Sequence, residues 1–173
     1  TFGGYLPTNP LGEEYFSQVP SRYGDHIAKL SIVPESDSFK ALSGQEVKLD
    51  DPNILRETVI DNLAAEGGSW TLRVQLCRDL DRQPVEDPSV LWDEADSPFV
   101  TVARLHVPAQ TGWTEEAAEL VDDHMRFSVW TGIQDHRPLG AINRARRRPY
   151  RMSADFRQRF NGCPIHEPIL TAE

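Results

Sequence analysis

The chain has 173 residues, of which 39% are hydrophobic, and its 27 acidic residues against 18 lysines and arginines give a net charge of −9. This length is typical of one soluble domain, because about 70% of the unfolded surface can be buried at about 150 residues. With no run near the ~20 apolar residues of a membrane span, no signal-peptide pattern and two cysteines, we expect neither a membrane protein nor a disulfide-rich secreted one, and we expect a cytoplasmic location.

The N-terminal segment, residues 1–20, is rich in proline, glycine and aromatic residues. This composition predicts an extended, ordered arm and not a flexible linker. The chain begins at Thr1, without an initiator methionine, directly in a turn-rich stretch. We therefore expect it to be a piece of a longer protein.

Two elements follow the arm. Residues 25–33 alternate imperfectly between apolar and polar side chains and end at Pro34, which predicts a strand. Residues 52–65 carry apolar side chains at helical spacing. We expect Asp51 to cap this helix and the glycines at 67–68 to end it.

The middle of the chain contains the clearest strand pattern. Residues 70–77 alternate strictly, with Trp70, Leu72 and Val74 on one face. An Asp- and Pro-rich loop is predicted over 79–98. Residues 99–107 alternate again up to a proline, which predicts another strand.

The C-terminal third is predicted to be mainly helical. Residues 115–124 form an acidic helix capped by Thr114, and residues 129–140 form a turn-rich connection. Residues 140–160 form an arginine-rich helix.

These segments indicate an α+β chain with three strands, which are antiparallel because their connections are irregular. Three strands are few for a closed structure, and an open sheet edge needs covering or pairing. We therefore expect part of the domain to lie outside this chain.

The negative charge is unevenly distributed. Residues 137–159 hold eight arginines against one acid, Asp155, so this stretch carries +7 and the remainder −16. Such a stretch is suited to a compact anion, since arginine binds carboxylate and phosphate with two parallel hydrogen bonds. A solvated helix face is the simpler interpretation, and an acidic body disfavours nucleic acid as a partner.

Common catalytic motifs are absent from the sequence. The five histidines are scattered, and the sequence has no nucleophile elbow, phosphate loop or dinucleotide fingerprint. Cys77, in a predicted strand, is interpreted as a small buried hydrophobic residue and not as a nucleophile.

One face of the last helix carries a distinctive set of side chains. Ile142, Arg146, Tyr150, Ser153 and Arg157 are separated by 4, 4, 3 and 4 positions, so they share a face of an α-helix. A guanidinium beside a tyrosine favours phenolate, which is a good ligand for ferric iron, and tyrosine is the proximal haem ligand in catalases.

Two observations leave alternatives open. Arg146 and Arg157 could be surface cations, with Tyr150 packed against the body. Pro149 lacks an amide hydrogen and disfavours helix at Arg148, so we expect the helix to kink or restart there.

Four segments, in order, resemble the catalase superfamily, and more specifically the shorter catalase-like haem proteins of bacteria. The last contains the proximal signature, in which arginine precedes tyrosine by four positions. The four segments are Ser21–Pro34, Ser69–Cys77, Ser89–Pro108 and His136–Arg157.

The resemblance implies a role for each residue of that signature. Tyr150 is the expected axial ligand of haem iron, Arg146 holds it as phenolate, and Arg157 lies near a haem propionate. Ser153 occupies a position where the family has threonine, and Phe127 resembles a phenylalanine that packs on the haem edge. Met152 and Pro149 depart from the family pattern.

The resemblance also implies the architecture. We expect part of a catalase-like antiparallel β-barrel with flanking helices, lacking the N-terminal half of the barrel. The expected regions are an arm (1–20), the C-terminal half of the barrel (21–135), the proximal haem-binding helix (136–162) and a tail (163–173). The distal histidine is expected upstream, so no catalytic residue is assigned within this chain.

The expected function is peroxide metabolism of the catalase or peroxidase type, acting on hydrogen peroxide or an organic hydroperoxide. Its expected cofactor is haem, and its expected partners are the missing N-terminal half and a possible second copy of the chain. This chain alone is expected to be inactive. The alternatives are a non-catalytic haem-binding relative and an enzyme that rearranges hydroperoxides.

Overall fold

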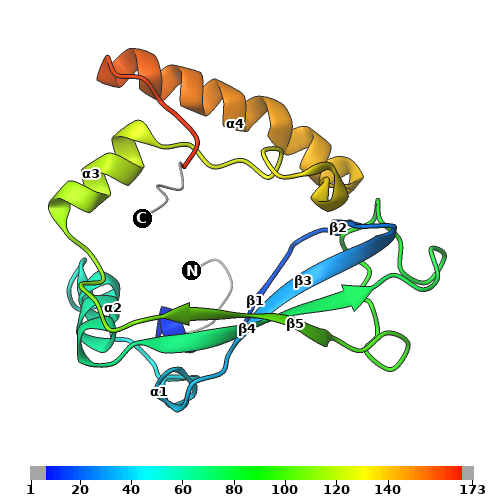
Figure 1. The fold of residues 1–173 in the computed structure, drawn as a ribbon, viewed down its shortest axis with the longest axis horizontal. Helices are drawn as coiled ribbons and strands as arrows, with labels where there is room; N and C mark the ends of the chain where they lie inside the picture. Colours follow the sequence, from blue (N-terminus) through cyan, green and yellow to red (C-terminus); the bar gives the residue numbers. More distant parts are fainter. Residues whose placement is uncertain (1–6, 169–173) are drawn as a thin grey trace. The chain divides into compact units, whose positions relative to one another are not determined.

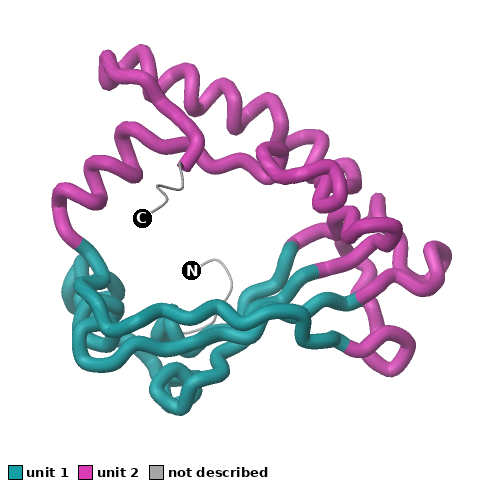
Figure 2. The backbone as a smooth tube through the Cα atoms, viewed as in Figure 1, with its two compact units in different colours: residues 1–17, 30–75, 99–113 teal, residues 18–29, 76–98, 114–173 magenta. Residues whose placement is uncertain are grey.

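The computed structural model describes residues 7–168, which fold into two compact units (Figure 2). Of the described residues, the first unit comprises 7–17, 30–75 and 99–113, and the second comprises 18–29, 76–98 and 114–168. The ends of the predicted arm and tail, residues 1–6 and 169–173, lie outside the described residues. No helix within residues 7–168 has both the length and the hydrophobicity to span a bilayer.

The described residues form a five-stranded sheet in which β1, β3, β4 and β5 follow in that order and β2 also pairs with β3 (Figure 1). The pairings of β1 and β2 with β3, and of β4 with β5, are antiparallel. The strands are β1 (Tyr15–Phe16), β2 (Ser21–Tyr23), β3 (His26–Pro34), β4 (Gly68–Leu76) and β5 (Val100–Val107).

The sheet is open at β5. This strand ends the order, and the side chains of Val100, Val102 and Leu105 are 51%, 39% and 44% exposed. Strand β4 pairs with β5 from Gly68 onward, and the register of this pairing changes between Leu72 and Arg73. The predicted α+β fold with an antiparallel, unclosed sheet is therefore confirmed.

The hydrophobic core of the first unit centres on the short helix α1 (Asp37–Lys40). Its Phe39 is 1% exposed and lies 4.4 Å, centroid to centroid, from the ring of Trp70 on β4. The Trp70 indole donates a hydrogen bond to the carbonyl of Leu11, in the 3-10 helix η1 (Pro10–Gly12). Leu42 and Leu63 complete the buried cluster.

Three longer helices follow the sequence predictions closely. They are α2 (Ile54–Ala65), α3 (Glu115–His124) and α4 (Gly140–Asn161), with the 3-10 helix η2 (Gln134–His136) before α4. Thr114 caps α3, since its hydroxyl accepts the amide hydrogen of Ala117 at 3.1 Å.

The structure corrects several details. Asn53, not Asp51, is the N-cap of α2, and the Asp51 carboxylate instead accepts the Asn53 amide hydrogen at 2.6 Å. The predicted arm contains η1 and β1, and β2 and α1 were also missed, so three strands become five. α4 neither stops nor restarts at Pro149, which lies inside one continuous helix.

Candidate functional site

The first half of α4 is held by a buried asparagine. Asn143 is 3% exposed, and its side-chain amide donates to the carbonyl of Leu139 at 2.9 Å. The main-chain carbonyl of Asn143 accepts a hydrogen bond from the indole of Trp130 at 2.9 Å. Trp130 belongs to the segment between α3 and η2, so this segment is fixed against the start of the helix.

The second half of α4 is held by Arg157. Its guanidinium donates to the carbonyl of Met125 at 2.9 Å and to that of Asp122, at the end of α3. One turn further on, the side-chain amide of Asn161 donates to the carboxylate of Asp123 at 2.9 Å. The two bonds of Arg157 satisfy main-chain carbonyls that the end of a helix leaves unpaired.

Tyr150 lies between these two anchored halves and lines a pocket of about 540 Å³. Its side chain is 41% exposed, and Phe127, which is 61% exposed, lines the same pocket together with Val129. The pocket therefore combines a phenol with apolar side chains.

The C-terminal segment forms another wall of the Tyr150 pocket, through Glu167 and Pro168. Its main chain is fixed, because the amide of Arg126 donates to the carbonyl of His166 at 3.0 Å. The Arg126 guanidinium also pairs with Glu167 at 2.7 Å.

A neighbouring pocket of about 410 Å³ also includes Tyr150 and Phe127 and is more strongly charged. Arg126, Arg147 and Arg151 line it, with Asp155 and Glu167. The Arg147 guanidinium lies 5.3 Å from the centre of the Trp130 ring, within the range of a cation–π contact.

Of the residues predicted for the site, the structure brings Tyr150 and Phe127 together in one pocket. The other three lie on α4 but are not among the described residues that line it. Arg146 donates to the side-chain carbonyl of Gln18, Ser153 is exposed, and Arg157 binds the two carbonyls near the end of α3.

A carboxylate that meets the start of α4 was not predicted from the sequence. Glu86 accepts two hydrogen bonds from Arg144, at 2.9 and 2.8 Å, across 58 positions of sequence. The backbone amide of Ala141 also bonds to this carboxylate. Glu86 therefore supplies the acidic cap that Leu139, the N-cap residue, has no side-chain group to provide.

This contact predicts a pH dependence. The hydrogen bonds from Arg144 hold the pKa of Glu86 below its usual value. The contribution of Glu86 to stability is thus complete above the unfolded-state value of about 4.3 and is lost as the pH falls through the lower folded value. Urea unfolding of wild type and Glu86→Gln should differ at pH 7, and the difference should shrink below about pH 4.3. Glu94→Gln, an exposed change in the same loop, is the control.

The residues around Tyr150 fit a haem group in their chemistry. A phenol oxygen can act as an iron ligand, Phe127 and Val129 offer apolar surface to a flat ring, and arginines nearby suit carboxylates. The pocket volume of about 540 Å³ lies within the range of about 300–1,000 Å³ usual for small-molecule sites.

Other metal chemistry has less support. Within residues 7–168, no three histidine, cysteine, aspartate or glutamate side chains gather as a candidate metal site. Partial burial raises the pKa of the Cys77 thiol, which disfavours the reactive thiolate. Cys77 is half-buried directly after β4, and not a fully buried residue of the strand as expected.

Comparison with known proteins adds information at the level of the fold. No family model matches the sequence, and no curated protein matches it significantly. Among solved structures, catalase A from Saccharomyces cerevisiae superposes with a TM-score of 0.68 over 95% of this chain, at 15% identity. A fungal catalase gives a TM-score of 0.64 over 88% of this chain, also at 15% identity.

The superpositions cover only 37% and 32% of those two catalase chains. The chain thus spans about a third of the length of the solved structures that it matches. The open antiparallel sheet and the helices described above correspond to that third. The chain therefore has a partial catalase-like fold, as the sequence resemblance predicted.

Proposed function

We propose that this chain is the haem-binding part of a catalase-like protein that metabolises hydrogen peroxide or an organic hydroperoxide. The observation that carries the proposal is the position of Tyr150, whose phenol lines a pocket of about 540 Å³ in a chain with a partial catalase-like fold. Haem iron, when bound, supplies the redox chemistry that cleaves the peroxide O–O bond.

In this proposal Tyr150 would hold the haem iron through its phenol oxygen, and the helix sets the position of this side chain. The Trp130–Asn143 bond fixes α4 before the tyrosine, and the bonds of Arg157 fix it afterwards. The phenol oxygen is thereby presented from a supported helix and not from a loop. Such support matters because a ligand must be held within about 0.5 Å of its productive position.

The arginines have separate tasks. Arg157 is a positioning residue, because its guanidinium binds main-chain carbonyls. Arg147, which the sequence did not single out, lines the charged pocket together with Tyr150, and its guanidinium lies over the ring of Trp130. The phenolate-stabilising role of Arg146 requires its guanidinium to leave the Gln18 side chain.

Peroxide cleavage also needs a group that moves a proton between the peroxide oxygens. No histidine is among the described residues that line the Tyr150 pocket. We propose that this group is a distal histidine on a further polypeptide segment that completes the catalase fold. The same observation favours a second candidate for the chain by itself, a haem-binding protein without peroxide chemistry.

Replacing Tyr150 with phenylalanine tests the ligand. Titration of the 173-residue chain with ferric haem should give a tyrosinate-type absorption spectrum. Tyr150→Phe should remove that spectrum and weaken haem binding by about tenfold or more, since the iron–oxygen bond is lost.

Tyr15→Phe is the matched control, because Tyr15 is 45% exposed against 41% for Tyr150 and lies in the other unit. An unchanged spectrum in Tyr150→Phe would exclude this tyrosine as the ligand. Haem uptake without peroxide consumption, in a complex with a complementing catalase N-terminal segment, would favour the second candidate.

A further inference from the structure

A separate cavity of about 280 Å³ lies in the second unit, beside the start of α4. Two arginines, Arg137 and Arg147, line it together with Trp130, Gln134 and Pro138. No acidic side chain is among its described lining residues. The two arginines that line this cavity carry like charges, which repel each other, and an anion bound there reduces that repulsion.

Both arginines are attached to fixed supports. The guanidinium of Arg147 lies over the ring of Trp130, and the indole of Trp130 is itself bonded to the carbonyl of Asn143. The main chain of Arg137 is held by its carbonyl, which accepts the amide hydrogen of Arg22 at 2.8 Å. Such support reduces the ordering cost of binding a ligand.

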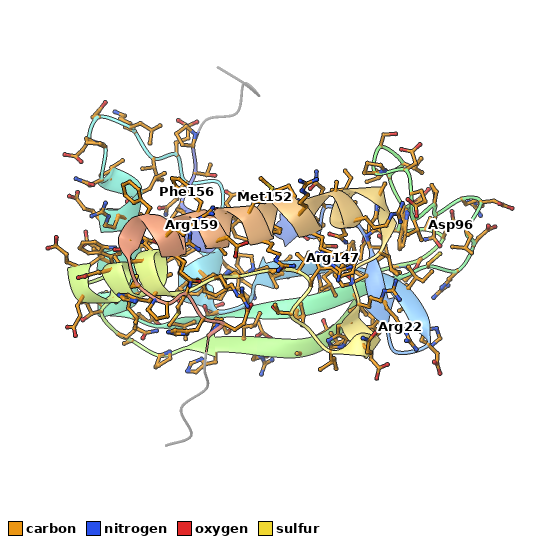
Figure 3. The ribbon with its side chains drawn as sticks, turned by 90° about the horizontal axis from the view of Figure 1, so that it is seen from above. Arg22, Asp96, Arg147, Met152, Phe156 and Arg159 are labelled. Carbon is orange, nitrogen blue, oxygen red and sulfur yellow. The ribbon has the colours of Figure 1, made fainter. Side chains whose placement is uncertain are left out.

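Asp135 and Glu86, which lie beside a lining residue and in an adjoining cavity, have other partners. Asp135, next to the lining residue Gln134, pairs with Arg22 at 3.8 Å, and Glu86 pairs with Arg144. Figure 3 labels Arg147 on α4 and Arg22 on the neighbouring strand. The positive charge at Arg137 and Arg147 therefore has no carboxylate assigned to it in the described ion pairs.

An adjoining cavity of about 370 Å³ shows how this region receives an anion. It shares Trp130, Arg137 and Arg147 with the smaller cavity, and it contains the carboxylate of Glu86. That carboxylate is bound by the fork of Arg144 and by the Ala141 amide. The smaller cavity is lined by the same two arginines, and no carboxylate is among its described lining residues.

We propose that the cavity between Arg137 and Arg147 binds a phosphate-type oxyanion, either inorganic phosphate or the phosphate of a small monoester. Each guanidinium can donate two parallel hydrogen bonds to phosphate oxygens. Two guanidinium groups together balance the two negative charges of a phosphate dianion. A volume of about 280 Å³ is at the lower end of small-molecule sites, which fits a phosphate with at most a small organic group.

Titration with inorganic phosphate tests this site, by calorimetry and by ³¹P line broadening in 100 mM KCl. Arg147→Gln and Arg137→Gln should each weaken phosphate binding by about tenfold, the loss expected for one charge-assisted contact. Arg147→Lys should also weaken it, because lysine keeps the charge but not the planar fork. Phenyl phosphate distinguishes the sources: tighter binding than phosphate indicates a monoester, and weaker binding indicates the free ion.

Arg159→Gln is the control, since Arg159 is an exposed arginine near the other end of α4 (Figure 3). It should leave phosphate binding unchanged. If Arg159→Gln weakens binding as much as Arg147→Gln, or if Arg147→Lys binds as wild type, the binding reflects overall charge and the proposal is wrong. The absence of phosphate binding to the wild-type chain would also overturn it.

Discussion

Replacing Phe39 with alanine is expected to lower the free energy of unfolding by about 3–5 kcal/mol. Phe39 is 1% exposed, and it packs against Trp70 at 4.4 Å within the cluster of Leu11, Leu42 and Leu63. The surrounding groups collapse only partly into the space of a removed ring, so the loss of burial is joined by the cost of a cavity. This is a large fraction of a typical total stability of about 5–15 kcal/mol.

Urea unfolding followed by tryptophan fluorescence measures this loss. Phe160→Ala is the matched control, because the same side chain is 79% exposed there and its removal should change stability by less than about 0.5 kcal/mol. Equal effects of the two substitutions would mean that Phe39 is not the centre of the core. The close approach of the ring to Gly68 supports the assignment, since a Cβ at Gly68 would lie 2.4 Å from it.

Gly140→Ala is expected to have the second-largest effect, a loss of about 2 kcal/mol or more. The backbone of Gly140 has a φ of +80°, which alanine adopts only with strain. An added Cβ would also lie 2.7 Å from the carbonyl oxygen of Val85. Because Gly140 begins α4, the main chain next to it must shift, and the Glu86 cap shifts with it.

Thermal unfolding with circular dichroism at 222 nm measures this change. Gly132→Ala is the control, because φ is ordinary at Gly132 and no heavy atom lies within 4 Å of the added Cβ. The control should be within about 0.5 kcal/mol of wild type. A wild-type Tm in Gly140→Ala would contradict the backbone conformation at the start of α4.

The long periodic segments could be predicted from the sequence. The alternating residues at 70–77 and 99–107 are β4 and β5, and Thr114 caps α3 as expected. Alternation or a cap residue is enough to predict such elements, even though every residue of β5 is exposed or half-buried and α3 has no buried residue. The partial catalase-like fold was predicted from the resemblance of four segments and not from periodicity.

Short elements could not be predicted in this way. β1 has two residues and α1 has four, which is too few for any periodic pattern, and their positions depend on pairing with β3 and on burial of Phe39. The N-cap of α2 is Asn53 and not Asp51, because residues 52–53 form a turn before the helix begins. Boundaries of this kind depend on local hydrogen bonds that a sequence pattern does not specify.

Some features of the candidate site could likewise be predicted from the sequence, and others could not. Spacing on one helix placed Tyr150, and the resemblance associated it with Phe127, which shares its pocket. The contacts of Arg144 with Glu86 and of Arg147 with Trp130 join residues 58 and 17 positions apart, so no local pattern reveals them. Shared helical spacing also did not show that Arg157 is engaged by the end of α3.

Pro149 gives α4 a mechanical property that follows from its position. A proline has no amide hydrogen, so the carbonyl of Ala145 lacks its helical donor one residue before Tyr150. The segments on either side are clamped, at Asn143 before and at Arg157 after. A helix bends most easily where one of its hydrogen bonds is missing, so we expect any bend of α4 to occur directly beside Tyr150 and to change the position of its phenol.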